Sequence, residues 1–105
     1  MHLQQIPFKM ISDGTKTIEI RLNDEKRRKI VPGDSIEFSH ALKPEMAVTR
    51  TVAETFRFDS FKELLAAFPY VEYGGDGKAD LSALYAYYSH DDETKFGVLA
   101  IRLKK

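Results

Sequence analysis

The chain has 105 residues, and 43% of them are hydrophobic, which is enough to build the core of one domain. Sixteen basic residues balance sixteen acidic ones, so the sequence lacks the basic excess of a protein dedicated to nucleic acid. The absence of cysteine excludes disulfides, thiolate metal sites and cysteine nucleophiles, and it agrees with a reducing cytoplasmic location. The first ten residues contain no long apolar run, so we expect neither a signal peptide nor a membrane span.

The first elements are a short strand and a helix. Residues 2–5 suit a short strand, and Pro7 can occupy the first turn of a helix. Apolar residues at helical spacing follow, and Asp13-Gly14 ends the helix because glycine readily adopts the left-handed conformation after a last turn.

The next segment, residues 16–21, is the most informative in the chain. Ile18 and Ile20 alternate with polar residues, which is the period-two pattern of a half-buried strand. One face of the strand is therefore apolar, and the other presents Glu19 and Arg21. Lys16 shares the parity of the isoleucines, but at the start of the strand it can swing over the edge toward the charged face. The pattern predicts a cation–anion–cation cluster beside a turn.

A helical turn and a reverse turn are predicted next. Asn23 or Asp24 could cap a helical turn over residues 25–29. The four basic residues 26–29 form a local cluster, which is typical of a solvated face. The reverse turn contains Pro32 and Gly33, which suit its two central positions.

Three further strands are predicted from alternation or from continuous apolar sequence. Residues 35–38 alternate, and residues 46–58 are rich in Val, Thr and Phe, with a bend expected near Ala53-Glu54. The nearly continuous apolar run 96–103 predicts a buried central strand.

Two helices are predicted between the last two of these strands. Asp59-Ser60 caps a helix over residues 61–68, and Asp80 caps a second one over residues 81–88. The glycine-rich stretch 74–77 predicts a loop between them. Together the elements predict one α+β domain, residues 1–105, built on a small, partly open β-barrel of about five or six strands with about three or four short helices.

Four sequence elements occur in an order that is typical of a known family. They are Gly14-x-Lys16-x-x-Glu19-x-Arg21, Ile30-x-x-Gly33-Asp34-x-Ile36-x-Phe38, Tyr87-Tyr88 and Phe96-Gly97-Val98-Leu99-Ala100-Ile101. With these elements the chain resembles the ASCH domain family of the PUA-like superfamily. The resemblance implies a small β-barrel with helices flanking a cleft, Lys16, Glu19 and Arg21 in that cleft, and binding of RNA or nucleotides.

Some small ASCH proteins that resemble this chain in length are amidohydrolases that act on N4-acetylcytidine. In those proteins a lysine accepts a proton, a threonine three residues later is the nucleophile, and a glutamate in a later loop donates a proton. Lys16 matches the first role and Glu72 could match the third, but Glu19 stands at the nucleophile position and Thr17 lies only one residue after Lys16. A neighbouring Glu19 would also keep Lys16 charged, which suits binding better than base catalysis.

Tyrosine rings that stack on a nucleobase contribute about 1–3 kcal/mol each. Tyr73, beside the glycine-rich stretch, and Tyr87 are the candidates for such a contact, whereas Tyr85 and Tyr88 at helical spacing are assigned to the core. The three histidines lack partners at the spacing of a metal site, and no phosphate-binding glycine motif is present, so we expect neither a metal nor a cofactor.

The preferred function is therefore a module that binds RNA or a modified nucleoside or nucleotide. The balanced net charge favours a nucleotide over long RNA, because many phosphate contacts require many cations. The alternatives are a metal-independent hydrolase, acting on an acylated nucleoside or on RNA through Lys16, Glu19 and Glu72, and a protein-interaction module with an exposed apolar patch.

Overall fold

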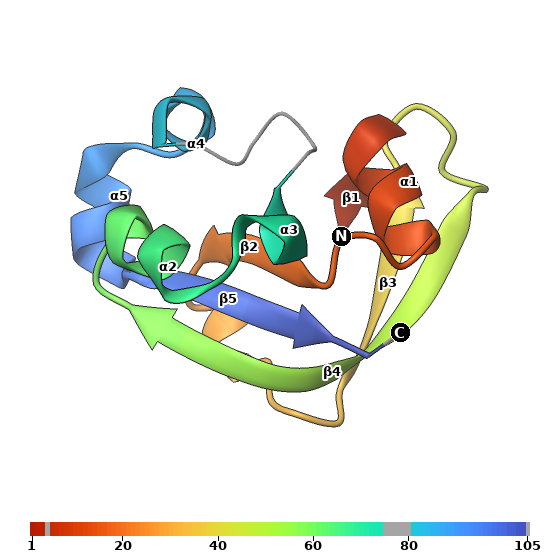
Figure 1. The fold of residues 1–105 in the computed structure, drawn as a ribbon, viewed down its shortest axis with the longest axis horizontal. Coiled ribbons are helices and arrows are strands. Elements are labelled where there is room, and N and C mark those ends of the chain that lie inside the picture. Colours follow the sequence, from red (N-terminus) through yellow and green to blue (C-terminus); the bar gives the residue numbers. More distant parts are fainter. Residues whose placement is uncertain (4, 75–80, 105) are drawn as a thin grey trace.

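A computed structural model describes residues 1–3, 5–74 and 81–104. In this part of the chain, five strands form one curled sheet in the order β1-β3-β4-β5-β2 (Figure 1). The strands are β1 (His2–Leu3), β2 (Ile18–Leu22), β3 (Ser35–His40), β4 (Ala47–Phe58) and β5 (Val98–Leu103). The helices are α1 (Gln5–Ser12), α2 (Phe61–Ala67), α3 (Tyr70–Tyr73), α4 (Leu81–Tyr87) and α5 (His90–Phe96), with a 3₁₀ turn, η1 (Arg27–Lys29).

The sheet is antiparallel except where β1 pairs with β3 in parallel. β5 lies between β4 and β2, and all but one of its residues are buried, which confirms the prediction of a buried central strand. β4 carries a register shift between Val52 and Glu54, where the sequence predicts a bend. The fold is thus α+β with short helices, as predicted, and the predicted partly open barrel is a five-stranded sheet curled into a half-barrel. None of the helices in the described residues is long and apolar enough to cross a membrane.

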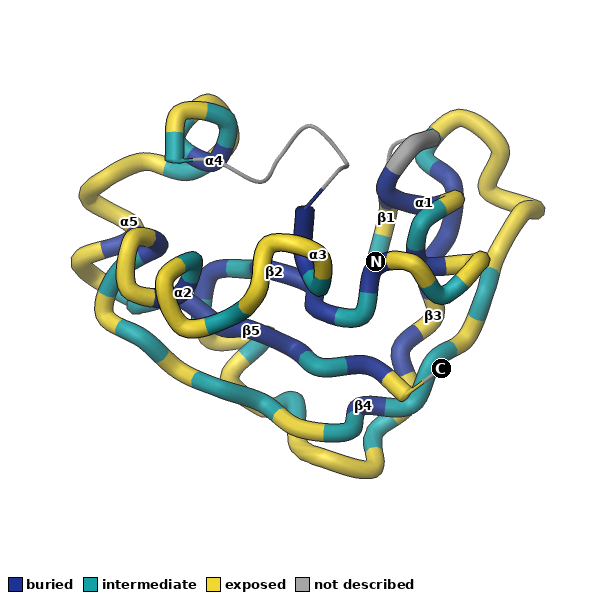
Figure 2. Tube along the Cα trace, in the orientation of Figure 1, coloured by how far each residue is buried: buried dark blue, intermediate teal, exposed yellow. Residues whose placement is uncertain are grey.

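The core has two parts, because both faces of β5 are buried. Figure 2 shows most of β5 in the colour of buried residues. One face packs with α1 and β3, and the other packs with α2 and α4. The first core includes Leu3, Phe8, Ile11, Phe38, Leu99 and Ile101, and the second includes Ile18, Ile20, Phe61, Leu64, Leu84, Val98 and Ala100.

Local signals define most of the boundaries as predicted. Gly14, with φ +82°, follows α1, and Gly33, with φ +96°, lies in the reverse turn before β3. The Ser60 Oγ accepts a hydrogen bond from the Glu63 N–H at the start of α2. Asp24 is a predicted cap, but the residue at the N-cap of η1 is Lys26; the Asp24 Oδ1 accepts from the Arg27 N–H at 2.9 Å.

Two helices were not predicted, α3 and α5. α5 is mostly polar and only one of its residues is buried. Its sequence therefore lacks the apolar residues at helical spacing that would indicate a helix. The Ser89 Oγ caps it by accepting from the Asp92 N–H at 3.1 Å. β1 ends at Leu3, earlier than the predicted residue 5. Asp80 and residues 75–77 of the glycine-rich stretch lie outside the described residues.

Gly97 joins α5 to β5 in a backbone conformation, φ +72° and ψ −173°, that only glycine readily adopts. A Cβ atom at this position would lie 3.0 Å from the Phe58 carbonyl oxygen. We therefore expect Gly97→Ala to lower the free energy of unfolding by about 1–3 kcal/mol in urea denaturation. Gly33→Ala is the control, because Gly33 also has a positive φ but a Cβ atom there would meet nothing within 4 Å. Equal losses in the two variants would show that the contact with Phe58 contributes nothing.

Candidate functional site

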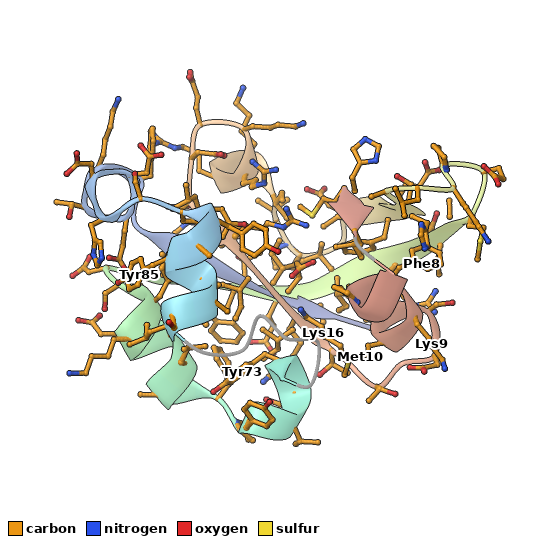
Figure 3. All side chains as sticks on the ribbon, turned by 90° about the horizontal axis from the view of Figure 1, so that it is seen from above. Phe8, Lys9, Met10, Lys16, Tyr73 and Tyr85 are labelled. Atoms are coloured by element: carbon orange, nitrogen blue, oxygen red, sulfur yellow. The ribbon has the colours of Figure 1, made fainter. Side chains whose placement is uncertain are left out.

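A cavity of about 210 Å³ lies at the edge of β2 that does not pair with β5. Figure 1 shows α4 and α1 on either side of β2, and Figure 3 shows Lys16 between them when the molecule is seen from above. Leu3 of β1 and Pro7 of α1 form an apolar side of the cavity. A second side is formed by β2 and by Lys16, which lies just before this strand. The remaining side is formed by α4.

The β2 side of the cavity is a buried ion-pair network. The Lys16 Nζ lies 3.4 Å from the Glu19 Oε1, and the Arg21 Nη2 lies 3.4 Å from the Glu19 Oε2. Lys16 is 4% exposed and Glu19 is 5% exposed. The predicted cation–anion–cation cluster is therefore present, and Lys16 reaches the charged face from its place before the strand. The charged face of β2 is buried against other parts of the fold and is not a solvated surface.

The edge of β2 explains why a carboxylate is held there. The Thr17 carbonyl accepts a hydrogen bond from the Leu103 N–H of β5 at 2.8 Å. The Asn23 N–H donates to the carbonyl of Gly97, the residue just before β5, at 3.0 Å. In an antiparallel pair the peptide groups alternate, so Glu19 and Arg21 bond to β5 and the peptide groups of Ile20 turn to the unpaired edge. The Ile20 N–H donates to the Glu19 Oε1 at 3.0 Å. The Glu19 side chain thus supplies a partner that a neighbouring strand would otherwise provide.

Glu19 is held as a carboxylate. Burial alone would raise its pKa, but the charges of Lys16 and Arg21 and the Ile20 N–H together outweigh burial and lower the pKa below its usual value. Each carboxylate oxygen faces one cation. Within the described residues, the network therefore joins one carboxylate to two cations.

Arg21 is not fully satisfied by its partner. Its side chain is 17% exposed, and its Nη2 lies beside Glu19. Its Nε atom is buried and has no hydrogen-bond partner among the described residues. A buried donor without an acceptor costs about 1–3 kcal/mol. Because this Nε is buried, a ligand with acceptor oxygens would reach the guanidinium only through its exposed part.

The α4 side of the cavity is apolar and aromatic. Leu84 is buried, Tyr88 is half-buried and Tyr87 is 63% exposed. Tyr88 also stacks on Phe61 of the second core, with ring centroids 5.4 Å apart. The prediction that Tyr88 packs in the core is confirmed, and the structure adds that this residue lines the cavity.

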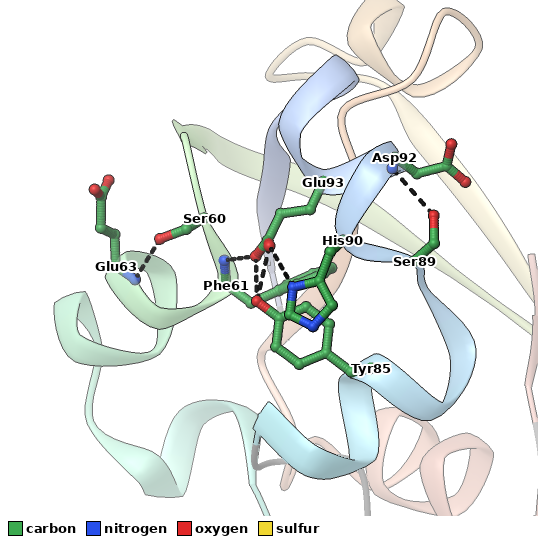
Figure 4. Close-up of polar contacts among 8 residues, drawn as sticks. All are labelled: Ser60, Phe61, Glu63, Tyr85, Ser89, His90, Asp92 and Glu93. Atoms are coloured by element: carbon green, nitrogen blue, oxygen red, sulfur yellow. Dashed lines mark hydrogen bonds and ion pairs between the residues drawn. The ribbon is translucent and has the colours of Figure 1, made fainter.

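A buried carboxylate on α5 anchors α4 (Figure 4). Glu93 is 7% exposed and accepts hydrogen bonds from the Phe61 N–H at 2.7 Å and from the Tyr85 hydroxyl at 2.7 and 2.8 Å. The His90 ring stacks on Tyr85, with centroids 3.8 Å apart. Glu93 thus ties α5 to α2 and α4. The sequence placed it only in an acidic segment, because its two hydrogen-bond donors, the Phe61 N–H and the Tyr85 hydroxyl, lie 32 and 8 residues away in the chain.

Of the predicted site residues, Lys16, Glu19, Arg21 and Tyr87 line the cavity together. Tyr73 does not, because it is buried in the second core, where its hydroxyl donates to the Leu65 carbonyl at 3.0 Å.

Glu72 also lies outside the cavity lining. Its Oε2 is 3.5 Å from the Arg102 Nη2, and its carbonyl accepts from the Thr17 N–H at 3.0 Å. Its backbone therefore supports the segment that carries Lys16, while its side chain binds a different cation. Among the residues that the structure describes, no group of three His, Asp or Glu side chains could hold a metal ion.

The chain matches the ASCH domain family over residues 1–105. It is similar to the crystal structure of the hypothetical protein PH0355, with 31% sequence identity, coverage of 99% of this chain and 94% of that chain, and a TM-score of 0.82. It is also similar to the solution NMR structure of protein PF0455 from Pyrococcus furiosus, with 31% identity, coverage of 99% and 93%, and a TM-score of 0.66. No curated protein matches the chain. The family match over the whole chain places this protein in the ASCH domain family.

Proposed function

We propose that the domain binds a nucleotide, free or within RNA, in the cavity between β2 and α4. The observation that carries the proposal is the buried Lys16–Glu19–Arg21 network, which faces Tyr87 and Tyr88 across one small cavity. Cations suit the phosphate or base acceptors of such a ligand, and an aromatic ring suits the face of a base.

The size of the cavity favours a small ligand. Its volume of about 210 Å³ lies below the range of about 300–1,000 Å³ for sites that take drug-sized molecules. The exposed ring of Tyr87 lies at the rim, where a base can stack on it. A single nucleotide fits this arrangement better than a stacked or paired segment.

Glu19 can contribute to recognition as well as to charge balance. A carboxylate offers about four acceptor positions. Described donors that approach Glu19 are the Lys16 Nζ, the Ile20 N–H and the Arg21 Nη2. At most about one acceptor position is left for a ligand, such as an amino group of a base.

Binding is favoured over hydrolysis by the same contacts. The amidohydrolases of the family use a threonine where this chain has Glu19, whose carboxylate already bonds to two cations and a backbone N–H. Glu72, the candidate proton donor, directs its carboxylate to Arg102 and does not line the cavity. The nucleophile and the proton donor of that mechanism are therefore both without a match in the cavity.

Tyr87→Ala is expected to weaken the binding of a nucleoside monophosphate by about tenfold, because it removes a stacking surface worth about 1–3 kcal/mol. Isothermal titration calorimetry with each of the four monophosphates measures the affinity. Tyr70→Ala is a matched control, since Tyr70 is 60% exposed on α3 and does not line the cavity.

Two results would contradict the proposal. One is that none of the four monophosphates binds, or that the two tyrosine variants weaken binding equally. The other is release of cytidine from N4-acetylcytidine by the wild type but not by Lys16→Ala, which would make the domain a hydrolase.

A further inference from the structure

The end of β2 leads directly from the cavity to a basic surface. β2 ends one residue after Arg21, and η1 begins five residues later. We use the term basic corner for Lys26, Arg27, Arg28 and Lys29 with Arg57 of β4. Arg57 belongs to this corner because its Nη2 donates to the Arg28 carbonyl at 3.0 Å.

The sheet register places the basic corner on the side of the sheet from which Arg21 points. Arg21 and Arg57 both pair with Leu99, one from each side of β5. Residues that are paired in register point to the same face, and neighbouring strands lie about 4.8 Å apart, so the two arginines start about 10 Å apart on one face. η1 is held against this face by Arg57.

The charges of the basic corner are only partly compensated. Residues 24–29 contain four cations and two carboxylates. Asp24 is engaged with Arg27, at 2.8 Å, whereas Glu25 is exposed. Lys26, Arg28 and Lys29 are exposed and form no ion pair with a described residue. Three cations are therefore available to a ligand at the surface.

The amino group of Met1 lies near the cations of both the cavity and the basic corner. It donates to the Glu37 carbonyl. Burial lowers its pKa first, and the charges of Arg21 and Lys26 lower it further, with a smaller contribution from Arg27. The Glu37 carboxylate acts in the opposite direction. The amino group of Met1 is therefore close enough to interact with Arg21 of the cavity and with Lys26 and Arg27 of the basic corner.

We infer that a single-stranded RNA whose nucleotide occupies the cavity continues past Arg21 onto the basic corner, where Lys26, Arg28 and Lys29 bind its phosphates. The inference rests on the proposed function for the cavity, and it adds a polymeric ligand and the direction of its path. Exposed lysine and arginine side chains that follow a backbone beside an aromatic contact are the usual means of binding single strands. The balanced net charge of the chain does not oppose this, because binding along a short surface path requires an excess of positive charge only on that path. We call this path, from the cavity to the basic corner, the track.

The test compares a randomised RNA hexamer with the four nucleoside monophosphates on the wild type and on K26Q/R28Q/K29Q. The hexamer is expected to bind the wild type at least about tenfold more tightly than any monophosphate. The variant should lose this difference and keep its affinity for monophosphates. Each neutralised phosphate on a single strand contributes about 0.7 to the salt dependence of log K, so the variant should lower that slope by about 2.

The control is K9Q/K43Q/K62Q, which removes the same charge from exposed residues elsewhere; Figure 3 shows Lys9 on α1. A double variant, K26Q/K29Q, repeats the test if the triple variant does not fold. The track is overturned if the hexamer binds no more tightly than a monophosphate, or if both triple variants lose the same affinity. If no monophosphate binds but hexamer binding depends on the basic corner, the cavity proposal and the path from the cavity are overturned, and only RNA binding by the basic corner stands. Absence of binding by either ligand would overturn both.

Discussion

Replacement of Glu19 by glutamine is expected to lower the free energy of unfolding by about 3–5 kcal/mol, measured by urea denaturation. The carboxylate lies between the Lys16 ammonium and the Arg21 guanidinium, and both it and Lys16 are at most 5% exposed. Without the anion, the buried Lys16 and the partly buried Arg21 lose the carboxylate that lies between them. A domain of this size has a total stability of about 5–15 kcal/mol, so the loss would be a large part of it.

Two further variants separate charge from side-chain volume. Glu37→Gln changes an exposed glutamate on β3 and should alter stability by less than about 0.5 kcal/mol. The double variant K16M/E19Q removes the closest buried cation together with the anion, so it should be more stable than E19Q alone. A K16M/E19Q protein no more stable than E19Q would show that the ion pair is not the source of the effect.

Acid titration gives an independent measurement for the same residue. The pKa of Glu19 is lower in the folded protein than in the unfolded chain, so its stabilisation is present above the unfolded value of about 4.3 and is lost as pH falls through the folded pKa. Below about pH 4, the wild type should therefore lose stability more steeply than E19Q. Parallel curves would contradict the assignment.

The sequence predicts the alternation on β2 but not its burial. Ile18 and Ile20 give the strand its period, and Glu19 and Arg21 fall on one face as expected. A charged face of a strand is usually solvated, and here β1, α1 and α4 make it a cavity wall. β1 and α1 lie near the start of the sequence and α4 near its end, so no local pattern in residues 16–21 records their presence.

Tyr73 and Glu93 show the same limit in opposite directions. Tyr73 stands beside glycines in the sequence and resembles an exposed loop residue. It is nevertheless buried, because its hydroxyl donates a hydrogen bond to the Leu65 carbonyl. Glu93 stands in an acidic run and resembles a solvated residue, yet it is buried because Phe61 and Tyr85 supply donors. In both cases the hydrogen-bond partner decides burial, and the partner is fixed by tertiary packing.

Glu93→Ala is expected to lower the free energy of unfolding by about 2–5 kcal/mol, because it leaves two donors without their acceptor at about 1–3 kcal/mol each. These donors are the Phe61 N–H, at the start of α2, and the Tyr85 hydroxyl. The negative charge of Glu93 also suits the N-terminal end of α2. Glu63→Ala is the control, since Glu63 is an exposed glutamate in the first turn of the same helix and should cost at most about 1 kcal/mol.

The titration of Tyr85 distinguishes a lost contact from a general loss of stability. The hydrogen bond to Glu93, then burial and then the Glu93 charge raise the pKa of Tyr85 in the wild type. The protonated tyrosine therefore stabilises the fold below its ordinary pKa of about 10, and this contribution is lost as pH rises through the folded value. In Glu93→Ala, ultraviolet titration should show the pKa of Tyr85 moving back toward 10. An unchanged pKa in a folded variant would mean that Glu93 does not hold Tyr85, and that α4 reaches the cavity through its core contacts alone.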